Sequence, residues 1–273
     1  MKQRGTSIDI DRVTKFFDVG AATPFQALAE VSLRIRPGEF VSVVGPSGCG
    51  KSTLMLMTAG LLGPTTGEIR VADSKLTQPL TDVGVVFQDD LLLDFRSAKD
   101  NVVLQGQIRH LDMAAIKNRT SELMDQLGVG KAASLYPRQL SGGMRQRVAI
   151  ARALVHDPSV LLMDEPFGAL DALTRLQVRH DLEQLWMNER PTVLFITHSV
   201  EEAVGLSDRV VVFSPSPGRI VQEIEIDLPR PRPLALGEAP ALSLHADRIY
   251  GLFEEMGVLS GATLHALNTR TSA

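Results

Sequence analysis

The sequence contains little cysteine, no long apolar run and no excess of basic residues. Its 273 residues include one cysteine, Cys49, so no disulfide can form within the chain, which suits a reducing compartment. No segment approaches the roughly 18 consecutive apolar residues of a membrane-spanning helix. The first residues also lack the apolar core of a signal peptide. We therefore expect a protein that is soluble or peripheral to a membrane.

The charge balance argues against a nucleic-acid partner. The chain has 28 Lys and Arg against 32 Asp and Glu, which gives a formal net charge of −4. Nucleic-acid-binding proteins more often carry a basic face. Phosphate binding remains compatible with this balance, because backbone amides can hold an anion without a positive net charge.

Patterns typical of strands and of helices alternate regularly along the chain. Short apolar runs such as VSVVG, SVLLMD and TVLFIT are typical of buried parallel strands, and amphipathic segments separate them. With 44% hydrophobic residues to build a core, this alternation predicts an α/β fold. From about residue 97 to residue 155 only helical patterns occur, which predicts a separate helical lobe.

The pattern changes after Asp227. The segment LPRPRPLALGEAP is rich in proline and predicts a semi-rigid linker, and HADRIYGLFEEMG predicts a short amphipathic helix. Two interpretations of residues 228–273 stay open: a tail that regulates the protein, or an appendage that only packs on it.

A glycine-rich loop between a predicted strand and a predicted helix indicates phosphate binding. Gly45, Gly50, Lys51 and Ser52 fit the pattern G-x-x-x-x-G-K-[ST]. Such a loop points successive N–H groups at one anion, and the helix adds the positive end of its dipole. We expect Lys51 to reach the β- and γ-phosphates of a nucleotide and Ser52 to hold Mg²⁺. The loop residues expected to bind the nucleotide are Gly45, Pro46, Ser47, Gly48, Cys49, Gly50, Lys51, Ser52 and Thr53. Within this set, Cys49 is interpreted as a small filler residue and not as a nucleophile.

Two consecutive carboxylates follow another buried strand. VLLMD ends in Asp164, and Glu165 comes next. Ligands bind at the carboxyl ends of strands in open α/β sheets, so this pair is placed for chemistry. Asp164 is expected to hold Mg²⁺, while Glu165 points differently and can face an attacking water. The alternative is a solvated acidic pair at a strand end.

A second helix start with anion-binding character lies further along the chain. Ser141, Gly142 and Gly143 precede the helical pattern MRQRVAIARAL. One nucleotide does not need two such helix starts from one subunit. A homodimer resolves this, because each ATP would be held by the loop of one subunit and capped by Ser141 of the other.

Together these motifs resemble the ATP-binding subunit of an ABC transporter, over about residues 8–226. The Lys51 loop corresponds to the Walker A motif, Asp164 with Glu165 to Walker B, and the Ser141 segment to the signature motif that acts in trans. The resemblance extends to Gln88 in VVFQDD as the Q-loop glutamine, Asp171 in GALDALTR as the D-loop and His198 in FITHS as the switch histidine. It implies catalytic roles for Lys51, Gln88, Glu165 and His198, and magnesium contacts for Ser52, Gln88 and Asp164.

The resemblance also implies an aromatic residue that stacks on adenine near the N-terminus. VTKFFD offers Phe16 and Phe17. From its position after Lys15 we favour Phe17, and for Phe16 the alternative is core packing.

The fold implied is a P-loop NTPase core with a mostly parallel sheet, an N-terminal antiparallel β portion and an inserted helical lobe. We expect an ATPase domain over residues 1–227, with the lobe at about residues 90–157, and a linker with a short helix over residues 228–273. The implied function is ATP hydrolysis that drives a transmembrane permease, with Mg²⁺ as the cofactor. The subunit would form a homodimer with ATP and lie on the cytoplasmic face of the inner or plasma membrane.

Within the ABC transporters, the chain resembles one branch of importers more closely than the others. Met144 with RQRVAIARAL, and the segments YPRQLSGGM and DRVVVFSPSPGRI, resemble importers of nitrate, sulfonate, taurine and bicarbonate. These import systems imply a separate substrate-binding protein. After Gln88 that branch often reads Leu-Leu-Pro-Trp-Arg, whereas this chain has LLDFR at residues 92–96. The apolar side chains of Leu91, Leu92, Leu93 and Phe95 either fill a groove between the lobes or form a socket for a permease helix.

Three other function classes share part of this pattern. A P-loop small-molecule kinase would have the Lys51 loop but no use for the Ser141 helix start. A non-transport ABC ATPase would usually carry a duplicated cassette, a long coiled coil or a basic surface, and this chain has none of these. A nucleotide-binding scaffold without turnover would need neither Glu165 nor His198.

Overall fold

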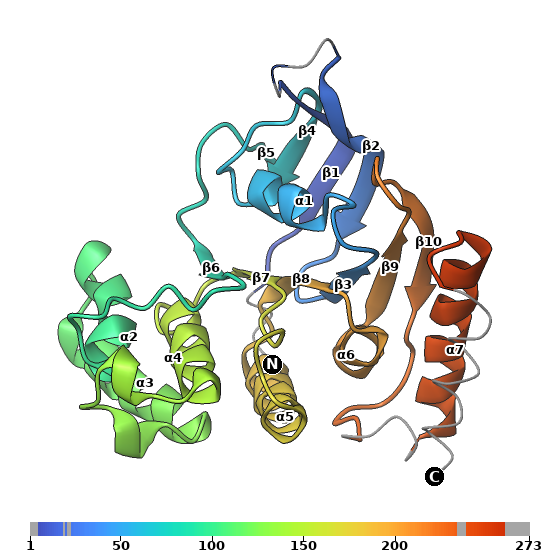
Figure 1. The fold of residues 1–273 in the computed structure, drawn as a ribbon. Coiled ribbons are helices and arrows are strands. Elements are labelled where there is room, and N and C mark those ends of the chain that lie inside the picture. Colours follow the sequence, from blue (N-terminus) through green and yellow to red (C-terminus); the bar gives the residue numbers. More distant parts are fainter. Residues whose placement is uncertain (1–4, 19, 21–22, 234–238, 260–273) are drawn as a thin grey trace. The chain divides into compact units, whose positions relative to one another are not determined.

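The computed structural model describes residues 5–18, 20, 23–233 and 239–259, and they form two compact units (Figure 1). The first, here called the P-loop unit, comprises Thr6–Leu80 and Thr192–Ala273. The second, here called the helical unit, comprises Thr81–Pro191 together with the first residues of the chain. Each unit is described by itself.

An antiparallel sheet occupies the first part of the P-loop unit. Its strand order is β2 (Phe25–Ile35), β1 (Ile8–Phe17), β4 (Thr66–Val71) and β5 (Ser74–Lys75). On β1 the residues Ile8, Ile10 and Val13 are buried, while the residues between them are not, as expected of a strand with one buried face. The N-terminal antiparallel portion predicted from the sequence is therefore confirmed, and β5 is a two-residue strand that no pattern indicated.

The mostly parallel strands of the P-loop unit surround β3 (Phe40–Val44). β3 pairs in parallel with β8 (Thr192–Thr197) and with β9 (Arg209–Phe213), and β10 (Ile220–Glu225) pairs antiparallel with β9. β3 and β8 are buried along their whole length, which explains their unbroken apolar sequence.

Three helices complete the P-loop unit. α1 (Lys51–Thr58) packs on β8 and β2, and α6 (Val200–Leu206) packs on β3, β8 and β9. α7 (Pro240–Glu255) packs against α6 (Figure 1). Side chains from α6, α7, β9 and β10 share one hydrophobic core. α1 is followed by a turn at Gly60, where φ is +73° and a Cβ would lie 2.5 Å from the Gln78 carbonyl oxygen. α7 is longer than predicted and begins with Pro240, a residue suited to the first helical position.

The helical unit contains two parallel strands, β6 (Val83–Val86) and β7 (Val160–Asp164). Its helices are α2 (Ala98–Ile108), α3 (Met113–Gln126), α4 (Gly142–Leu154) and α5 (Ala172–Glu189), with short 3-10 turns η1 (Gly130–Ala132) and η2 (Pro137–Gln139). α2 packs on both α3 and α4, drawn in green in Figure 1.

Local capping explains where these helices begin. The side chains of Ser97, Asp112, Ser141 and Asp171 each accept a hydrogen bond from a backbone N–H in the first turn of the following helix. The α/β class with mostly parallel pairing is confirmed, and the boundaries given above for the domain and its lobe stay a prediction. None of the helices in the described part of the chain combines the length and apolar character needed to cross a bilayer.

Candidate functional site

The glycine-rich loop leaves the end of β3 and opens directly into α1. Gly48 and Gly50 have φ values of +76° and +92°, a backbone region that favours glycine. At Gly50 a Cβ would lie 2.6 Å from Leu28 Cδ2 and 2.8 Å from the Ala27 carbonyl oxygen, so no larger residue fits. Gly50 also stands at the N-cap of α1 without any side-chain capping bond. The first N–H groups of α1 are therefore not covered by a cap, as an anion-binding helix start requires.

Lys51 lies over this loop. Its Nζ donates hydrogen bonds to the carbonyl oxygens of Gly45, at 2.8 Å, and Pro46, at 3.0 Å. The side chain is 5% exposed, so the ammonium group is held within the loop and not in bulk water. A cation fixed beside uncapped N–H groups fits a bound phosphate, and the phosphate-binding role of Lys51 stays a prediction.

Cys49 packs beneath the loop. It is fully buried, and its Sγ lies 3.8 Å from Lys51 Nζ. Burial raises the pKa of the Cys49 thiol, against the opposite effect of the Lys51 charge. A Cβ at Gly45 would lie 3.0 Å from Cys49 Sγ, so the thiol fills the space under the loop. This environment supports the interpretation of Cys49 as a filler residue.

The P-loop unit brings His198 to the same sheet edge as the glycine-rich loop. In the parallel pairing of β3 and β8, Val44 is the partner of Thr197. Gly45 and His198 follow these two residues, so both leave the sheet at neighbouring positions. The His198 side chain is exposed.

The two candidate aromatic residues end β1. Phe16 is 39% exposed, so the alternative that it serves core packing is wrong. Phe17 is partly buried, and Lys15 Nζ lies 5.1 Å from the centre of its ring. Successive side chains of a strand point to opposite faces, so at most one of the two rings faces a given ligand. The adenine-stacking role of Phe17 stays a prediction.

In the helical unit, Gln88 and the acidic pair follow neighbouring strand ends. β6 and β7 pair in parallel, with Val86 opposite Met163. Gln88 follows β6 by two residues, and Asp164 is the last residue of β7. The unit therefore places the amide and the two carboxylates at one edge of this strand pair.

The backbone turns sharply between the two carboxylates. Glu165 has a φ of 44°, which is uncommon for a residue with a Cβ. The Gly168 N–H donates to the Glu165 carbonyl oxygen at 3.1 Å and closes the turn. Such strained positions cluster at functional sites. The backbone thus leaves the extended conformation of β7 at Glu165, directly after Asp164, which supports separate tasks for the two carboxylates.

The start of α4 lies against the start of α5 within the helical unit. Ser141 accepts a hydrogen bond from the Met144 N–H at 3.3 Å, and Asp171 accepts one from the Thr174 N–H at 3.0 Å. Hydrogen bonds from Thr174 lower the pKa of Asp171. A Cβ at Gly143 would lie 2.4 Å from Thr174 Cγ2, so glycine is needed for this close approach. The predicted signature and D-loop segments thus form one continuous surface.

The predicted magnesium contacts are oxygen donors of the type that Mg²⁺ prefers. Ser52 and Gln88 are exposed and Asp164 is partly exposed, so the chain presents a hydroxyl, an amide and a carboxylate to a ligand. Magnesium sites at nucleotides use one or two carboxylates and fill the remaining positions with phosphates and water. The donor set therefore fits this ion.

Sequence reasoning missed the residues that fix the loop after Gln88. Arg145 Nε contacts Asp90 Oδ2 at 2.9 Å, and Arg152 donates to the carbonyl oxygens of Asp90 and Leu91 at 2.6 and 2.7 Å. Fully buried Asn101 accepts from the Leu93 N–H at 2.7 Å and donates to the Leu93 carbonyl oxygen at 3.2 Å. The spacing of the two arginines, two turns apart on α4, was the available signal.

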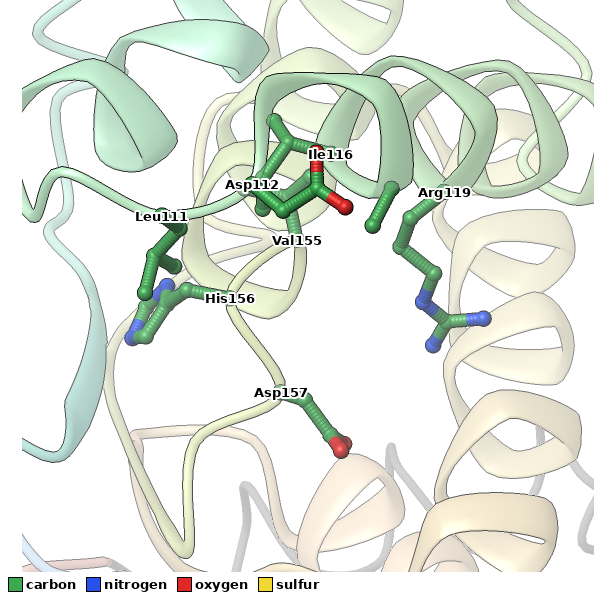
Figure 2. A pocket seen from close by; sticks show the side chains of 8 residues that line it. Leu111, Asp112, Ile116, Arg119, Val155, His156 and Asp157 are labelled. Atoms are coloured by element: carbon green, nitrogen blue, oxygen red, sulfur yellow. The ribbon is translucent and has the colours of Figure 1, made fainter.

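A cavity in the helical unit is separate from all of these residues. It has a volume of about 360 Å³ and is lined by Leu111, Asp112, Ala115, Ile116, Arg119, Val155, His156 and Asp157 (Figure 2). Three of its polar side chains each have a partner within the chain. Arg119 forms an ion pair with Glu189, Asp112 accepts from the Ala114 N–H at 2.9 Å, and His156 Nε2 donates to the Val83 carbonyl oxygen at 3.1 Å.

His156 makes the stability of the protein depend on pH. Burial, followed by the charge of Arg109, lowers the pKa of His156 from 6.5 to about 4. The unfolded chain therefore binds a proton between pH 6.5 and pH 4 that the folded chain does not, and stability falls as the pH drops through this window. We expect His156→Gln, which can still donate to Val83, to remove this loss. From pH 7 to pH 5 the variant should gain on the order of 1 kcal/mol relative to the parent.

Urea unfolding of both proteins at the two pH values measures this gain. Contributions from all other titrating groups cancel in the difference. A constant difference between the two proteins would show that His156 titrates normally in the folded state.

The comparisons with known proteins agree with this geometry. The family model described as ABC transporter matches residues 28–168. The aliphatic sulfonates import ATP-binding protein SsuB of Bacillus cereus is 40% identical over 226 residues, which cover 83% of this chain and 88% of that protein. The nitrate import ATP-binding protein NrtC of Synechococcus elongatus is 45% identical over 226 residues, which cover 82% of this chain and 34% of that protein.

A solved structure is similar in fold as well as in sequence. The dimeric structure of MJ0796, a bacterial ABC transporter cassette, superposes with a TM-score of 0.72 at 32% identity and covers 81% of this chain and 99% of that chain. The same cassette is also known in a post-hydrolysis state bound to ADP and Pi. On the matched family model and on relatives of this identity and coverage, the chain belongs to the ABC transporter family and is an ATPase.

Proposed function

We propose that this protein is the ATP-hydrolysing subunit of an importer for small oxyanions or sulfonates. The coupling to a membrane partner depends most on one observation, the apolar loop after Gln88, in which the helical unit holds the backbone and leaves Leu91 and Phe95 exposed. The proposal extends to the division of the chain into an ATPase domain over residues 1–227 and a tail over residues 228–273.

In the proposed reaction, Glu165 polarises the water that attacks the γ-phosphate. Lys51 and His198 offer positive charge or hydrogen bonds to the phosphoryl oxygens, and Gln88 orients the water. Asp164, Gln88 and Ser52 would hold Mg²⁺, which neutralises the charge that develops on the phosphates. Phe17 would stack on the adenine.

We propose that ATP draws two copies of the chain together. The exposed start of α4 and the capping residue Asp171 would face the ATP held by the partner's loop. Next to Asp171, Leu173 is 79% exposed, which is unusual for a leucine and is accounted for if a second copy covers it. The dimeric structure of the MJ0796 cassette supports this arrangement.

The loop after Gln88 is suited to contact a membrane partner. Phe95 is 76% exposed and Leu91 is 55% exposed, so the helical unit itself does not cover these side chains. Arg145, Arg152 and Asn101 hold the backbone on either side of them, as described above. A fixed loop that presents large apolar side chains fits a socket for an amphipathic helix. A displacement of Gln88 would reach such a helix within a few residues.

Replacing Phe95 by alanine tests this contact. Truncating an aromatic anchor at an interface costs about 2 kcal/mol or more of binding free energy. We expect Phe95→Ala to bind ATP and fold like the parent, yet to copurify poorly with the permease and to support little uptake. Leu244→Ala is a matched control, because Leu244 on α7 is also an exposed apolar residue, at 69%. Normal assembly of Phe95→Ala with the permease would contradict the socket.

The importer class follows from the relatives. SsuB is named for import of aliphatic sulfonates and NrtC for import of nitrate, so small anions are the proposed cargo. The protein would then be peripheral on the cytoplasmic face of the membrane and work with a permease and a separate substrate-binding protein. Uptake of nitrate, taurine and alkanesulfonates by the reconstituted system tests this class. If the system hydrolyses ATP but takes up none of these anions, the proposed cargo is wrong and the ATPase assignment is unaffected.

A further inference from the structure

One arginine of α4 contacts both the start of its own helix and the loop after Gln88. Arg145 Nη1 donates a hydrogen bond to the Leu140 carbonyl oxygen at 2.9 Å, and Arg145 Nε donates one to Asp90 Oδ2 at 2.9 Å. Leu140 shares its peptide group with Ser141, the predicted signature residue. A single guanidinium group therefore joins the peptide before Ser141 to the carboxylate of Asp90.

Asp90 is held at its side chain and at its backbone. The second oxygen of its carboxylate, Oδ1, accepts a hydrogen bond from the Leu92 N–H at 3.1 Å. Arg152 donates to the Asp90 carbonyl oxygen at 2.6 Å. The carboxylate thus binds the loop with one oxygen and α4 with the other. A displacement of Arg145 that keeps both of its contacts would move the loop as well.

Leu91 lies between these contacts in an uncommon backbone conformation. Its φ is 46°, in the left-handed region that residues with a Cβ rarely adopt. Such a conformation persists where the surrounding structure imposes it. The Leu91 side chain is exposed, so the constraint comes from hydrogen bonds at Asp90, at Leu92 and at the Leu91 carbonyl oxygen, to which Arg152 donates at 2.7 Å. Releasing Asp90 would allow this part of the loop to relax.

The contact between Arg145 and Asp90 is suited to survive a movement of α4. It joins two ionised groups, and such a charge-assisted hydrogen bond is stronger than one between neutral groups. The two side chains are 37% and 27% exposed, so water and salt screen the pair only in part. α4 also packs on β6 and on α2, the elements on either side of the loop. The ion pair adds a directed polar contact to this packing.

We propose that Arg145 and Asp90 are positioning residues that transmit a displacement of the Ser141 segment to the apolar loop that carries Phe95. This inference rests on the proposed function, in which Ser141 meets the ATP of a second copy and the loop contacts a permease. When that ATP draws the start of α4 into place, the Arg145 side chain moves Asp90 with it. The loop then presents Phe95 differently in the ATP-bound and in the nucleotide-free protein.

Hydrogen exchange of the loop with and without MgATP tests the proposal. The full-length chain carries Glu165→Gln, so that ATP stays bound and the dimer persists. We expect the backbone N–H groups of residues 90–95 to change their exchange rate about fivefold when this dimer forms, the factor that corresponds to one hydrogen bond. With Asp90→Asn added, the dimer should still form, and the change should fall below about twofold.

The choice of asparagine keeps the fold of the loop. Its side-chain oxygen can still accept from the Leu92 N–H, but the charge that attracts Arg145 is lost. Arg145→Gln should weaken the response to ATP in the same way. The double variant should respond like either single one, because both changes break the same contact. The inference is overturned if the loop of the Glu165→Gln dimer does not respond to ATP, or if both single variants respond as strongly as that parent.

A second arginine of α4 provides a matched control. Arg147 donates to the Leu127 carbonyl oxygen at 2.8 Å, and its Nη1 lies 3.6 Å from Asp181 Oδ2. Arg147→Gln should therefore lower the stability of the helical unit and leave the response of the loop intact. If Arg147→Gln also abolishes the response, general damage to α4 explains the result, and the role of the contact with Asp90 is wrong.

Gel filtration distinguishes a failure of this inference from a failure of the proposed function. If Glu165→Gln stays monomeric with MgATP, the proposed dimer and the role of Ser141 in it are wrong, and the inference falls with them. If the parent and Asp90→Asn both form dimers and their loops respond equally, only the connection through Arg145 and Asp90 is wrong. Should Arg145→Gln fail to fold, Asp90→Asn alone decides.

Discussion

Glu165→Gln should bind ATP as the parent does and lose at least about 100-fold in turnover. Glutamine keeps the size and the hydrogen-bonding reach of the side chain, but it cannot take up a proton from the attacking water. The positive φ of Glu165 belongs to the backbone, so the substitution leaves the turn after β7 unchanged. Binding, which depends on the Lys51 loop and α1, should therefore survive while the chemical step fails.

The same variant should accumulate as an ATP-bound dimer. Without hydrolysis the two copies have no means of reopening, so gel filtration with MgATP should show a species of twice the mass. Glu30→Gln, which removes an exposed carboxylate from β2, is the control and should behave like the parent. A Glu165→Gln protein that stays monomeric and hydrolyses at the parent rate would contradict the assignment of Glu165.

Ser141→Arg should abolish hydrolysis with little loss of nucleotide affinity. The arginine would stand at the start of α4, where the Ser141 hydroxyl now caps the Met144 N–H. In the proposed dimer this position faces the ATP of the other copy. A bulky cation there would block closure of the dimer, but it would not affect ATP binding by the loop of its own subunit. We expect a decrease of at least about 100-fold in kcat, as for loss of a phosphate-stabilising group.

Mixing two inactive variants tests the trans arrangement directly. Lys51→Ala damages the loop of its own subunit, and Ser141→Arg damages the cap that it gives to its partner. A mixed dimer therefore contains one intact site and one site with both defects, and some ATPase activity should return on mixing. If Ser141→Arg abolishes binding of ATP to the isolated monomer, Ser141 serves its own subunit and the proposed geometry is wrong.

Much of the fold could be predicted because its signals are local. The unbroken apolar runs VLLMD and TVLFIT, and the capping residues Ser97 and Asp112, are signals that lie within a few positions of the elements they indicate. The close approach of Gly60 to the Gln78 carbonyl, just after α1, could not be predicted, because it joins residues that are distant in sequence. The start of α7 at Pro240 was missed, because its first turn carries few apolar residues in phase.

The residues of the candidate site could be predicted from the sequence. The residues that hold them in place through hydrogen bonds could not. A glycine-rich loop or an acidic pair can be recognised from its residue types and their spacing, because the chemistry requires both. The hydrogen bond from Arg145 to Asp90 joins residues 55 positions apart, so no local pattern indicates it. Asn101, which holds the loop before Phe95, resembles any polar residue of a helix until the structure shows it fully buried.

Arg145 and Arg152, which hold the loop after Gln88, give α4 a second role. Ser141 at its start and Arg152 near its end are about 16 Å apart along a helix that rises about 1.5 Å per residue. Because Arg152 holds the carbonyl oxygens of Asp90 and Leu91, the loop that carries Phe95 moves with the helix. A tilt of about 4° at the start of α4 would move its far end by about 1 Å. In the proposed complex α4 would therefore act as a lever, and the length of this one helix would set the displacement that reaches a membrane partner.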